Sequence, residues 1–369
     1  MTLDGWRARW LALRNRVLAS PAFQRGAARF PLTRPIARRR ARALFELVAG
    51  FTYSQTLFAC VTTGLIDALA NRPLATNEVA ARTGLPEPGA DRLLKAATAI
   101  GVVERVGDRW TLGKHGAALR GNPGIAAMVA HHAALYTDLA DPVALLQRGG
   151  GGGALSRYWS YAESPGAGGA AEVAAYSRLM AASLPMVAEQ ALAAYPFARH
   201  RRLLDVGGGE GAFVAAIGAR VPRLSLALFD LPAVAARARE SLAAAGLTDR
   251  AVIHEGDFTR DSIPQGFDLI SLVRILHDHD DEVANALLLR IREALPPGGR
   301  LLIVEPMAQT PGAGPAGDAY FGFYLLAMGS GRPRTPREII SMLHGAGFRS
   351  GRPIATDLPL IARVIVAER

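Results

Sequence analysis

From residue 202 onward the sequence alternates short apolar runs with stretches of helical pattern, and this alternation constrains the fold most strongly. The runs are almost uninterrupted, which is typical of strands that are buried on both faces of a sheet. Strands that alternate with helices favour a parallel α/β sheet with helices on both sides. The predicted strands are Leu203–Val206, Leu224–Phe229, Ala251–Glu255, Leu269–Val273 and Leu301–Val304.

The last two apolar runs, Gly351–Thr356 and Leu360–Ala367, have no helical stretch between them. Two strands joined this closely can only pair antiparallel, so we expect a hairpin at the edge of the sheet. The predicted class is α/β, with a Rossmann-like and mostly parallel sheet that ends in an antiparallel hairpin.

The amino-terminal part is predicted to be helical, with a small winged-helix module. Between residues 6 and 70, apolar residues recur at intervals of three and four, and such helices would pack together or against a second subunit. Residues 74–112 read as a winged helix, with two short helices and a β-wing at Val102–Leu112. We therefore expect a basic arm at 1–42, a helical and winged-helix domain at 43–195, and the α/β domain at 196–369.

Positive charge is concentrated at the amino end. Residues 1–42 contain eleven Arg and one Asp, a net charge of +10 that equals the charge of the whole chain. Such an arm suits anionic lipid, nucleic acid or an acidic partner, and the alternative is a solvated Arg-rich helix pair. The chain shows no secretory signal and no unbroken apolar run long enough to span a membrane, so we expect a cytoplasmic protein. The single cysteine, Cys60, excludes an internal disulfide.

The first predicted strand of the α/β domain runs directly into the glycine-rich loop Asp205–Gly211, of sequence DVGGGEG. Glycines let the backbone approach a ligand closely, and the helix that opens at Ala212 presents free N–H groups. Gly207, Gly209 and Ala212 also fit the dinucleotide fingerprint G-x-G-x-x-A, so an NAD enzyme is an alternative at this point.

Acidic residues at the strand ends favour S-adenosylmethionine as the cofactor. Asp205 precedes the glycines, where a carboxylate suits the methionine end of the cofactor, and Asp230, followed by Leu231, ends the second strand, where it suits the ribose hydroxyls. Asp257 and Phe258 follow the third strand and suit the amino group and the face of adenine. We expect S-adenosylmethionine to bind here and to leave as S-adenosylhomocysteine.

A candidate base follows the fourth strand. His277 would stand at the mouth of the sheet, and Glu305, at the end of the next strand, could orient its imidazole. Methyl transfer to oxygen needs a base because the hydroxyl becomes nucleophilic as its proton leaves. Asp278, His279 and Asp280 are also metal-capable, but adjacent loop residues rarely point at one ion, and no metal is predicted.

These motifs, in the order DVGGGEG, FDLP, GDF, ILHD and VEP, resemble the winged-helix S-adenosylmethionine-dependent O-methyltransferases, which include plant phenolic and acetylserotonin methyltransferases. The resemblance covers roughly residues 45–369. It implies that His277 is the general base, that Glu305 assists it, and that the chain forms a homodimer through its amino-terminal domain. The positions matching cofactor contacts are Gly207, Asp230, Asp257 and Phe258.

The sequence departs from the plant pattern at two places. Val273 and Arg274 stand where plant enzymes have a Lys-Trp pair, so the cofactor contact of that Lys is lost or taken over by Arg274. A second assisting Glu falls near Pro333, so a single Glu–His pair must suffice.

A closer resemblance lies at the amino end. Residues 30–45 and 49–55, together with the HDHDD run that begins at His277, are similar to the hydroxyneurosporene (demethylspheroidene) O-methyltransferases of purple bacterial carotenoid synthesis. That family methylates a tertiary hydroxyl at the end of a long, membrane-resident polyene. The resemblance implies a hydrophobic acceptor, and the basic arm then fits peripheral contact with the inner or photosynthetic membrane.

Two alternatives remain open from the sequence. The same machinery could methylate a phenol, a polyketide or a tetrapyrrole. A winged-helix DNA-binding regulator is the alternative from another class, but its candidate recognition helix, Glu87–Ile100, carries two acidic and two basic residues and is neutral. We therefore expect no nucleic-acid partner.

Overall fold

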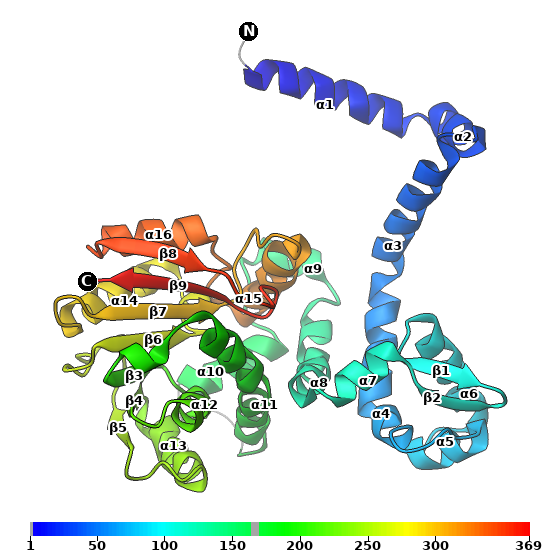
Figure 1. The fold of residues 1–369 in the computed structure, drawn as a ribbon. Coiled ribbons are helices and arrows are strands. Elements are labelled where there is room, and N and C mark those ends of the chain that lie inside the picture. The colour runs from blue at the N-terminus through cyan, green and yellow to red at the C-terminus, as the bar shows by residue number, and fades with distance from the viewer. Residues whose placement is uncertain (1–2, 164–169) are drawn as a thin grey trace. The chain divides into compact units, whose positions relative to one another are not determined.

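The computed structural model describes residues 3–163 and 170–369. The chain forms two compact units, Met1–Ala118 and Leu119–Arg369 (Figure 1). Each unit has its own elements and is described by itself.

The first unit is helical, with a small β-wing. Its antiparallel wing pairs Val103 with Leu112, and the buried Trp110 bridges to Leu74 and donates from its indole nitrogen to Thr76 Oγ1 at 3.0 Å. The predicted winged helix is confirmed. The elements of this unit are α1 (Leu3–Ala19), α2 (Pro21–Arg29), α3 (Arg34–Thr62), α4 (Leu65–Ala68), α5 (Thr76–Thr83), α6 (Glu87–Ala99), β1 (Val103–Val106), β2 (Arg109–Leu112) and α7 (Lys114–Arg120), which crosses into the second unit.

The long helix α3 carries an exposed apolar stripe. Leu44, Leu47, Val48 and Phe51 recur at helical spacing, and they are 65%, 80%, 65% and 74% exposed. Among the residues that the structure describes, α3 is also the one helix whose length and composition would allow it to cross a membrane. A contiguous apolar face of this kind marks a surface that something covers.

The second unit is a sheet with helices around it. Its strands are β3 (Arg202–Val206), β4 (Ser225–Asp230), β5 (Ala251–Glu255), β6 (Leu269–Val273), β7 (Arg300–Glu305), β8 (Ser350–Ile354) and β9 (Arg363–Glu368). Its helices are α8 (Pro123–Asp138), α9 (Pro142–Gln147), α10 (Ala154–Glu163), α11 (Ala170–Ala194), η1 (Phe197–Arg199), α12 (Ala212–Arg220), α13 (Pro232–Ala244), η2 (Leu276–Asp278), α14 (Asp281–Ala294), the π-helix η3 (Ala316–Phe321), α15 (Gly322–Met328) and α16 (Pro336–Gly345).

The strand order within the described residues is β5-β4-β3-β6-β7-β9-β8. Neighbours among β5, β4, β3, β6 and β7 pair parallel, whereas β9 pairs antiparallel with both β7 and β8. The predicted Rossmann-like class and the antiparallel edge hairpin are both confirmed. The order reverses between β3 and β6, and ligands bind at such switch points in open α/β sheets.

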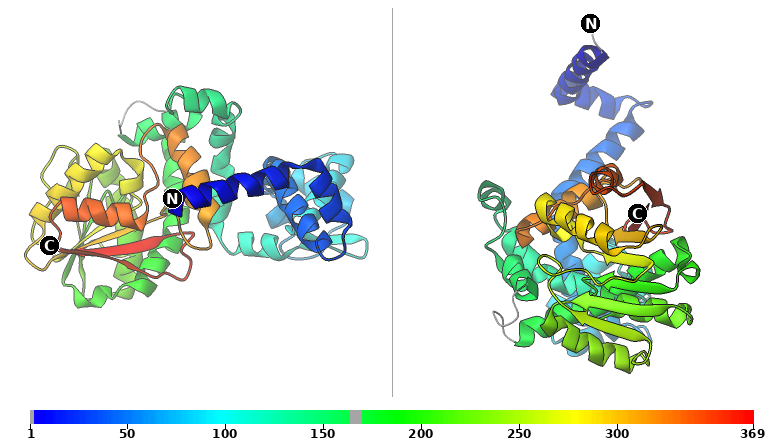
Figure 2. Two further views of the ribbon diagram at one scale, coloured as in Figure 1. Left: turned by 90° about the horizontal axis from the view of Figure 1, so that it is seen from above. Right: turned by 90° about the vertical axis from the view of Figure 1, so that its left-hand side faces the viewer.

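Alternate residues of β3, β4, β6, β7 and β9 enter two different cores, which explains why these strands appear in the sequence as unbroken apolar runs. Leu204 and Val206 of β3 pack with α14 and α16, while Leu203 packs with α11, α12 and α13. Figure 2 shows helices on both sides of the sheet. The sheet is thus fixed from both faces, and its strand ends are held in one register.

This register brings the carboxyl ends of the central strands together. Val206 lies beside Phe229, Asp230 beside Glu255, and Val273 beside Val304. The loops that follow β5, β4, β3, β6 and β7 therefore emerge side by side, in that order, along one edge of the unit.

Candidate active site

The glycine loop after β3 needs residues without side chains. Gly207 and Gly209 have φ angles of +69° and +59°, a left-handed conformation that favours glycine. A Cβ on Gly208 would lie 2.8 Å from Asp205 Oδ2, so the backbone here runs directly over that carboxylate. Helix α12 then begins at Ala212, which leaves its first N–H groups at the loop.

Asp205 is buried and only half satisfied. Its Oδ1 accepts from Ser271 Oγ at 2.5 Å, while Oδ2 has no hydrogen-bond partner in the described part of the chain. Burial raises the pKa of this carboxyl to about 7. A buried carboxylate oxygen without a partner, directly below a glycine loop, fits a ligand that supplies a donor or a positive charge.

Asp230 holds the glycine loop in place from the neighbouring strand. Its two carboxylate oxygens accept from the backbone N–H of Gly209 at 2.8 Å and of Leu231 at 2.7 Å. Burial raises its pKa to about 6. Because a carboxylate has about four lone-pair positions, Asp230 can accept further donors from a ligand.

The loop after β5 brings Phe258 against the glycine loop. A Cβ on Gly207 would lie 3.5 Å from Phe258 Cε1, and the Phe258 ring meets His279 edge-on at a centroid distance of 5.3 Å. Asp257 Oδ1 accepts from the backbone and the hydroxyl of Thr259 at 2.8 and 2.6 Å. Both predicted adenine-site residues therefore lie at the strand edge next to the glycines.

His277 is buried on the 3₁₀ turn η2, between two carboxylates. Its Nε2 lies 3.0 Å from Asp278 Oδ1, and its Nδ1 lies 3.7 Å from Glu305 Oε2. The closer contact of Glu305 is with the backbone N–H of His277, at 3.2 Å. The structure thus brings the predicted pair together, but it adds Asp278 as the carboxylate that contacts the ring most closely.

The charge state of His277 follows from this geometry. Burial of the ring lowers its pKa, but the neighbouring Asp278 and Glu305 carboxylates outweigh this, and the pKa of His277 lies above its ordinary value of 6.5. Burial also raises the pKa of Glu305, an effect that the positive charges on His277 and Arg334 oppose.

Arg274 has an uncommon backbone conformation at the end of β6. Its φ angle is +59°, which is rare for a side chain of this size, and such conformations gather at functional sites. Its side chain donates a hydrogen bond from Nη1 to Ser183 Oγ of α11, at 2.9 Å, and its contact with the cofactor stays a prediction. Its positive charge opposes the rise in the pKa of His277.

Aromatic residues form a wall beside His277. The Phe321 ring on η3 lies 6.1 Å from the His277 ring, and the neighbouring Tyr320 is bonded to His132 Nε2 at 2.7 Å. Tyr324 is bonded in the same way to His131 Nε2 at 2.9 Å. Burial lowers the pKa of His131 to about 4, so this wall stays uncharged at neutral pH.

Sequence reasoning missed several of these residues. Ser271 lies inside a predicted strand but belongs to no motif, whereas Ser183 and the two His–Tyr pairs join segments far apart along the chain that no spacing rule connects. His131 and His132 of α8 are partly buried where they bond these tyrosines.

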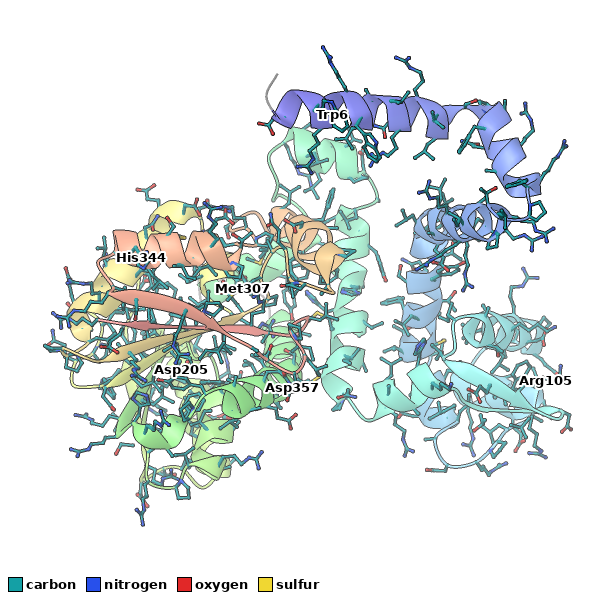
Figure 3. All side chains as sticks on the ribbon, turned by 45° about the horizontal axis from the view of Figure 1, so that its top comes forward. Trp6, Arg105, Asp205, Met307, His344 and Asp357 are labelled. Carbon is teal, nitrogen blue, oxygen red and sulfur yellow. The ribbon has the colours of Figure 1, made fainter. Side chains whose placement is uncertain are left out.

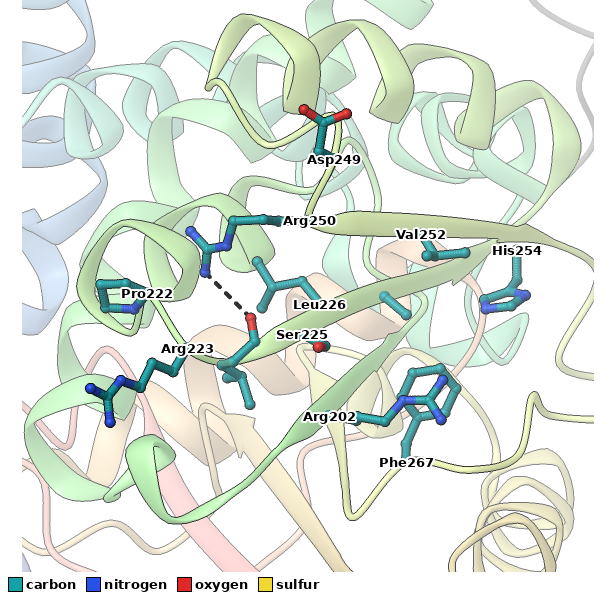
Figure 4. A pocket seen from close by; sticks show the side chains of 12 residues that line it. Arg202, Pro222, Arg223, Ser225, Leu226, Asp249, Arg250, Val252, His254 and Phe267 are labelled. Carbon is teal, nitrogen blue, oxygen red and sulfur yellow. Dashed lines mark hydrogen bonds between the residues drawn. The ribbon is translucent and has the colours of Figure 1, made fainter.

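A pocket of about 430 Å³ lies at the opposite end of the strands from the glycine loop (Figure 4). It is lined by basic residues from the amino ends of β3 and β4 and from the start of β5. Arg250 donates to the carbonyls of Gly218, Val221 and Leu224, while Arg202 stacks over a phenyl ring. These two guanidinium groups serve the fold, and the pocket is separate from the glycine loop.

Comparisons with known proteins agree with this site. The O-methyltransferase domain matches residues 136–349, and the O-methyltransferase dimerisation domain matches residues 45–117. Demethylspheroidene O-methyltransferases of Cereibacter sphaeroides and Rhodobacter capsulatus are each 43% identical to this chain; they cover 96% and 92% of it, and it covers 94% and 85% of them. The solved S-adenosylmethionine-dependent methyltransferase SibL is similar with a TM-score of 0.75 and 27% identity, over 89% of this chain and 98% of that one.

The sheet order, the glycine loop and the acids at the strand ends define an S-adenosylmethionine-dependent methyltransferase. The chain belongs to the O-methyltransferase family. It is an S-adenosylmethionine-dependent O-methyltransferase, and its dimerisation domain supports assembly as a homodimer.

The pKa of His277 leads to a prediction about pH. A base must be neutral to accept a proton, so kcat/KM should fall on the acid side with an apparent pKa above 6.5. Asp278→Asn removes the negative charge nearest the ring and should move this acid limb to lower pH. A pH profile of kcat/KM for both proteins measures the effect. An acid limb that stays in place or moves to higher pH in Asp278→Asn would contradict the assignment of this limb to the protonation of His277.

Proposed function

We propose that this enzyme methylates the tertiary hydroxyl of a 1-hydroxy carotenoid such as demethylspheroidene. The observation that carries the proposal is 43% identity to two demethylspheroidene O-methyltransferases over almost the whole chain. The aromatic wall beside His277 is compatible with an extended apolar acceptor, because Phe321, Tyr320 and Tyr324 pack their rings together there.

The strand-end residues would hold the cofactor in the order in which the sheet presents them. Phe258 and Asp257 suit the adenine, Asp230 and Leu231 the ribose, and Asp205 the methionine amino group. The glycine loop, through Gly207 and Gly209, admits the cofactor close to the backbone, and Arg274 closes the β6 end of the same edge. S-adenosylmethionine supplies an activated methyl group and leaves as S-adenosylhomocysteine.

His277 would act as the general base and Glu305 as its support. A tertiary alcohol is a far weaker acid than a phenol, so its proton must leave as the methyl group arrives. The imidazole is buried, and its Nε2 is held by Asp278. We infer that the acceptor hydroxyl displaces Asp278 from Nε2 and passes its proton to that nitrogen, while the one proton of the neutral imidazole is carried on Nδ1, which faces Glu305.

The acceptor can be tested with methyl-labelled S-adenosylmethionine. The purified enzyme is incubated with a 1-hydroxy carotenoid or with a phenolic acceptor, and labelled products are identified by mass spectrometry. We expect label on the terminal oxygen of the carotenoid. Transfer to the phenol with none to the carotenoid would replace the proposed acceptor with the phenol, polyketide or tetrapyrrole alternatives.

Variants at the base test the chemistry in the same assay. His277→Ala should leave S-adenosylhomocysteine affinity nearly unchanged and lower kcat by about 10²–10⁴-fold, the usual contribution of a positioned base. Glu305→Gln should cause a smaller loss, because the imidazole remains in place. The double variant should fall little below His277→Ala. Near-native turnover of His277→Ala would reduce His277 to a structural residue.

We also propose a division of labour along the chain: a basic arm at 1–42, a dimerisation and substrate domain at 43–195, and the cofactor domain at 196–369. The exposed stripe of α3, which includes Leu47 and Phe51, lies mostly within the matched dimerisation domain, and a second subunit would cover it. This use of α3 favours a dimer interface over a membrane span.

The arm would bring a cytoplasmic enzyme to the membrane that holds its acceptor. Trp6 (Figure 3) and Trp10 are 65% and 53% exposed on α1, Leu13 follows at helical spacing and is 57% exposed, and the same helix carries four arginines. Tryptophan favours the membrane interface, and arginine contacts anionic headgroups.

Removing residues 1–42 should weaken binding to anionic vesicles. Each Arg near the surface contributes about 1 kcal/mol before screening by salt. Co-sedimentation with phosphatidylglycerol vesicles, at low and high salt, measures the loss, and neutral phosphatidylcholine vesicles serve as the control. Activity on a detergent-solubilised acceptor should change less. Equal vesicle binding by the truncated and full-length proteins would return the arm to a solvated helix pair.

A further inference from the structure

Arg334 is completely buried next to the loop that carries His277, although it takes no part in the motifs. Its side chain is 0% exposed, and it is the largest of the fully buried side chains in the described residues. A buried guanidinium is costly unless its donors are paired. Here Nε and Nη2 both contact Asp281 Oδ1, at 2.9 and 2.6 Å.

The remaining bonds of Arg334 go to the turn itself. Nη1 donates to the carbonyl of Leu276, and Nη2 donates to the carbonyl of His279 at 2.8 Å. These two carbonyls bracket His277, one residue before it and two after it. The planar guanidinium of Arg334 therefore contacts both ends of the turn that positions the imidazole. Through Asp281 it also connects this turn to the start of α14.

Two residues just before Arg334, Ser330 and Gly331, form hydrogen bonds with the same turn. Ser330 Oγ donates to the Asp278 carbonyl at 2.8 Å, and the Gly331 amide donates to Asp280 Oδ1 at 2.9 Å. A Cβ on Gly331 would lie 2.1 Å from the His277 carbonyl oxygen, so the two backbones are in direct contact. The 330–334 segment is thus packed against the turn along its whole length.

We propose that Arg334 is a positioning residue for the His277 base, because its planar fork fixes the two carbonyls that bracket His277. This inference rests on the proposed role of His277 as the base. Arg334 also favours the ionised form of Glu305, because its positive charge opposes the rise in the pKa of Glu305 that burial causes. The segment in which the plant enzymes carry a second assisting Glu thus acts on the base here through a buried cation.

Two substitutions separate the shape of Arg334 from its charge. Arg334→Lys keeps the charge but loses the fork, because an ammonium is a compact donor without fixed planar geometry. Arg334→Met removes both. Arg332→Met is the matched control, since Arg332 bonds the same Asp281 at 3.0 Å from the surface.

We expect both Arg334 variants to lower kcat by about 10-fold or more while the Kd for S-adenosylhomocysteine changes less than about 3-fold. In Arg334→Met the acid limb of kcat should also move to higher pH, because loss of a buried positive charge makes the coupled His277–Glu305 pair easier to protonate. In Arg334→Lys the limb should stay near its wild-type position. Arg332→Met should lower kcat less than either variant.

A second readout does not depend on turnover. The imidazole signal of His277, assigned by its loss in His277→Ala, is followed by NMR in protein labelled with ¹³C-histidine. In Arg334→Met we expect this signal to shift and broaden, and in Arg332→Met to stay close to its wild-type position. An unchanged His277 signal and native kcat in folded Arg334→Met would overturn the inference. Native kcat in His277→Ala would instead remove the base assignment on which it rests.

Discussion

The parallel register of five strands is the constraint on which the site depends. Because β5, β4, β3, β6 and β7 run the same way, and the inner four are buried on both faces, their carboxyl ends lie along one edge of the sheet. Each strand places one part of the candidate site at this edge: Asp257 after β5, Asp230 on β4, the glycine loop after β3, His277 after β6 and Glu305 on β7. A shift of register would separate His277 from the glycine loop, so the cores that fix the sheet also fix the arrangement of the candidate site.

Buried charge is arranged in pairs along this edge. Asp205 accepts a hydrogen bond from Ser271, and Asp230 accepts hydrogen bonds from two backbone amides. His277 lies between two carboxylates, and Arg334 donates to the carbonyls of the turn that carries it. Three atoms lack a partner in the described residues: Asp205 Oδ2, His277 Nδ1 and Glu305 Oε1. Unpaired buried atoms are costly, and all three lie at the strand edge where donor and acceptor would meet. The site is therefore organised for ligands that supply the missing partners.

The sequence predicted the sheet well because strand burial leaves a local signal. The boundaries of β5 and β6 agree with the apolar runs to the residue, and the winged helix follows from its turn at Gly84 and the wing around Trp110. Contacts between distant segments were beyond such reasoning. The Arg334 fork, the bond of Arg274 to Ser183 and the His–Tyr pairs join residues 53 to 193 positions apart, and no periodicity encodes them. Asp278 was noticed only as a metal-capable residue, because the adjacent position gives no hint that its side chain turns back onto the His277 ring.

A crystal structure of the enzyme with S-adenosylhomocysteine would test most directly the claim that one strand edge assembles the site. We predict that the adenine lies at Phe258, the ribose hydroxyls at Asp230, and the amino group near Asp205, with the sulfur directed toward His277. Binding of the product elsewhere, for example in the basic pocket at the amino ends of β3 and β4, would contradict the account. So would a bound product whose sulfur points away from His277, because the base could then play no part in methyl transfer.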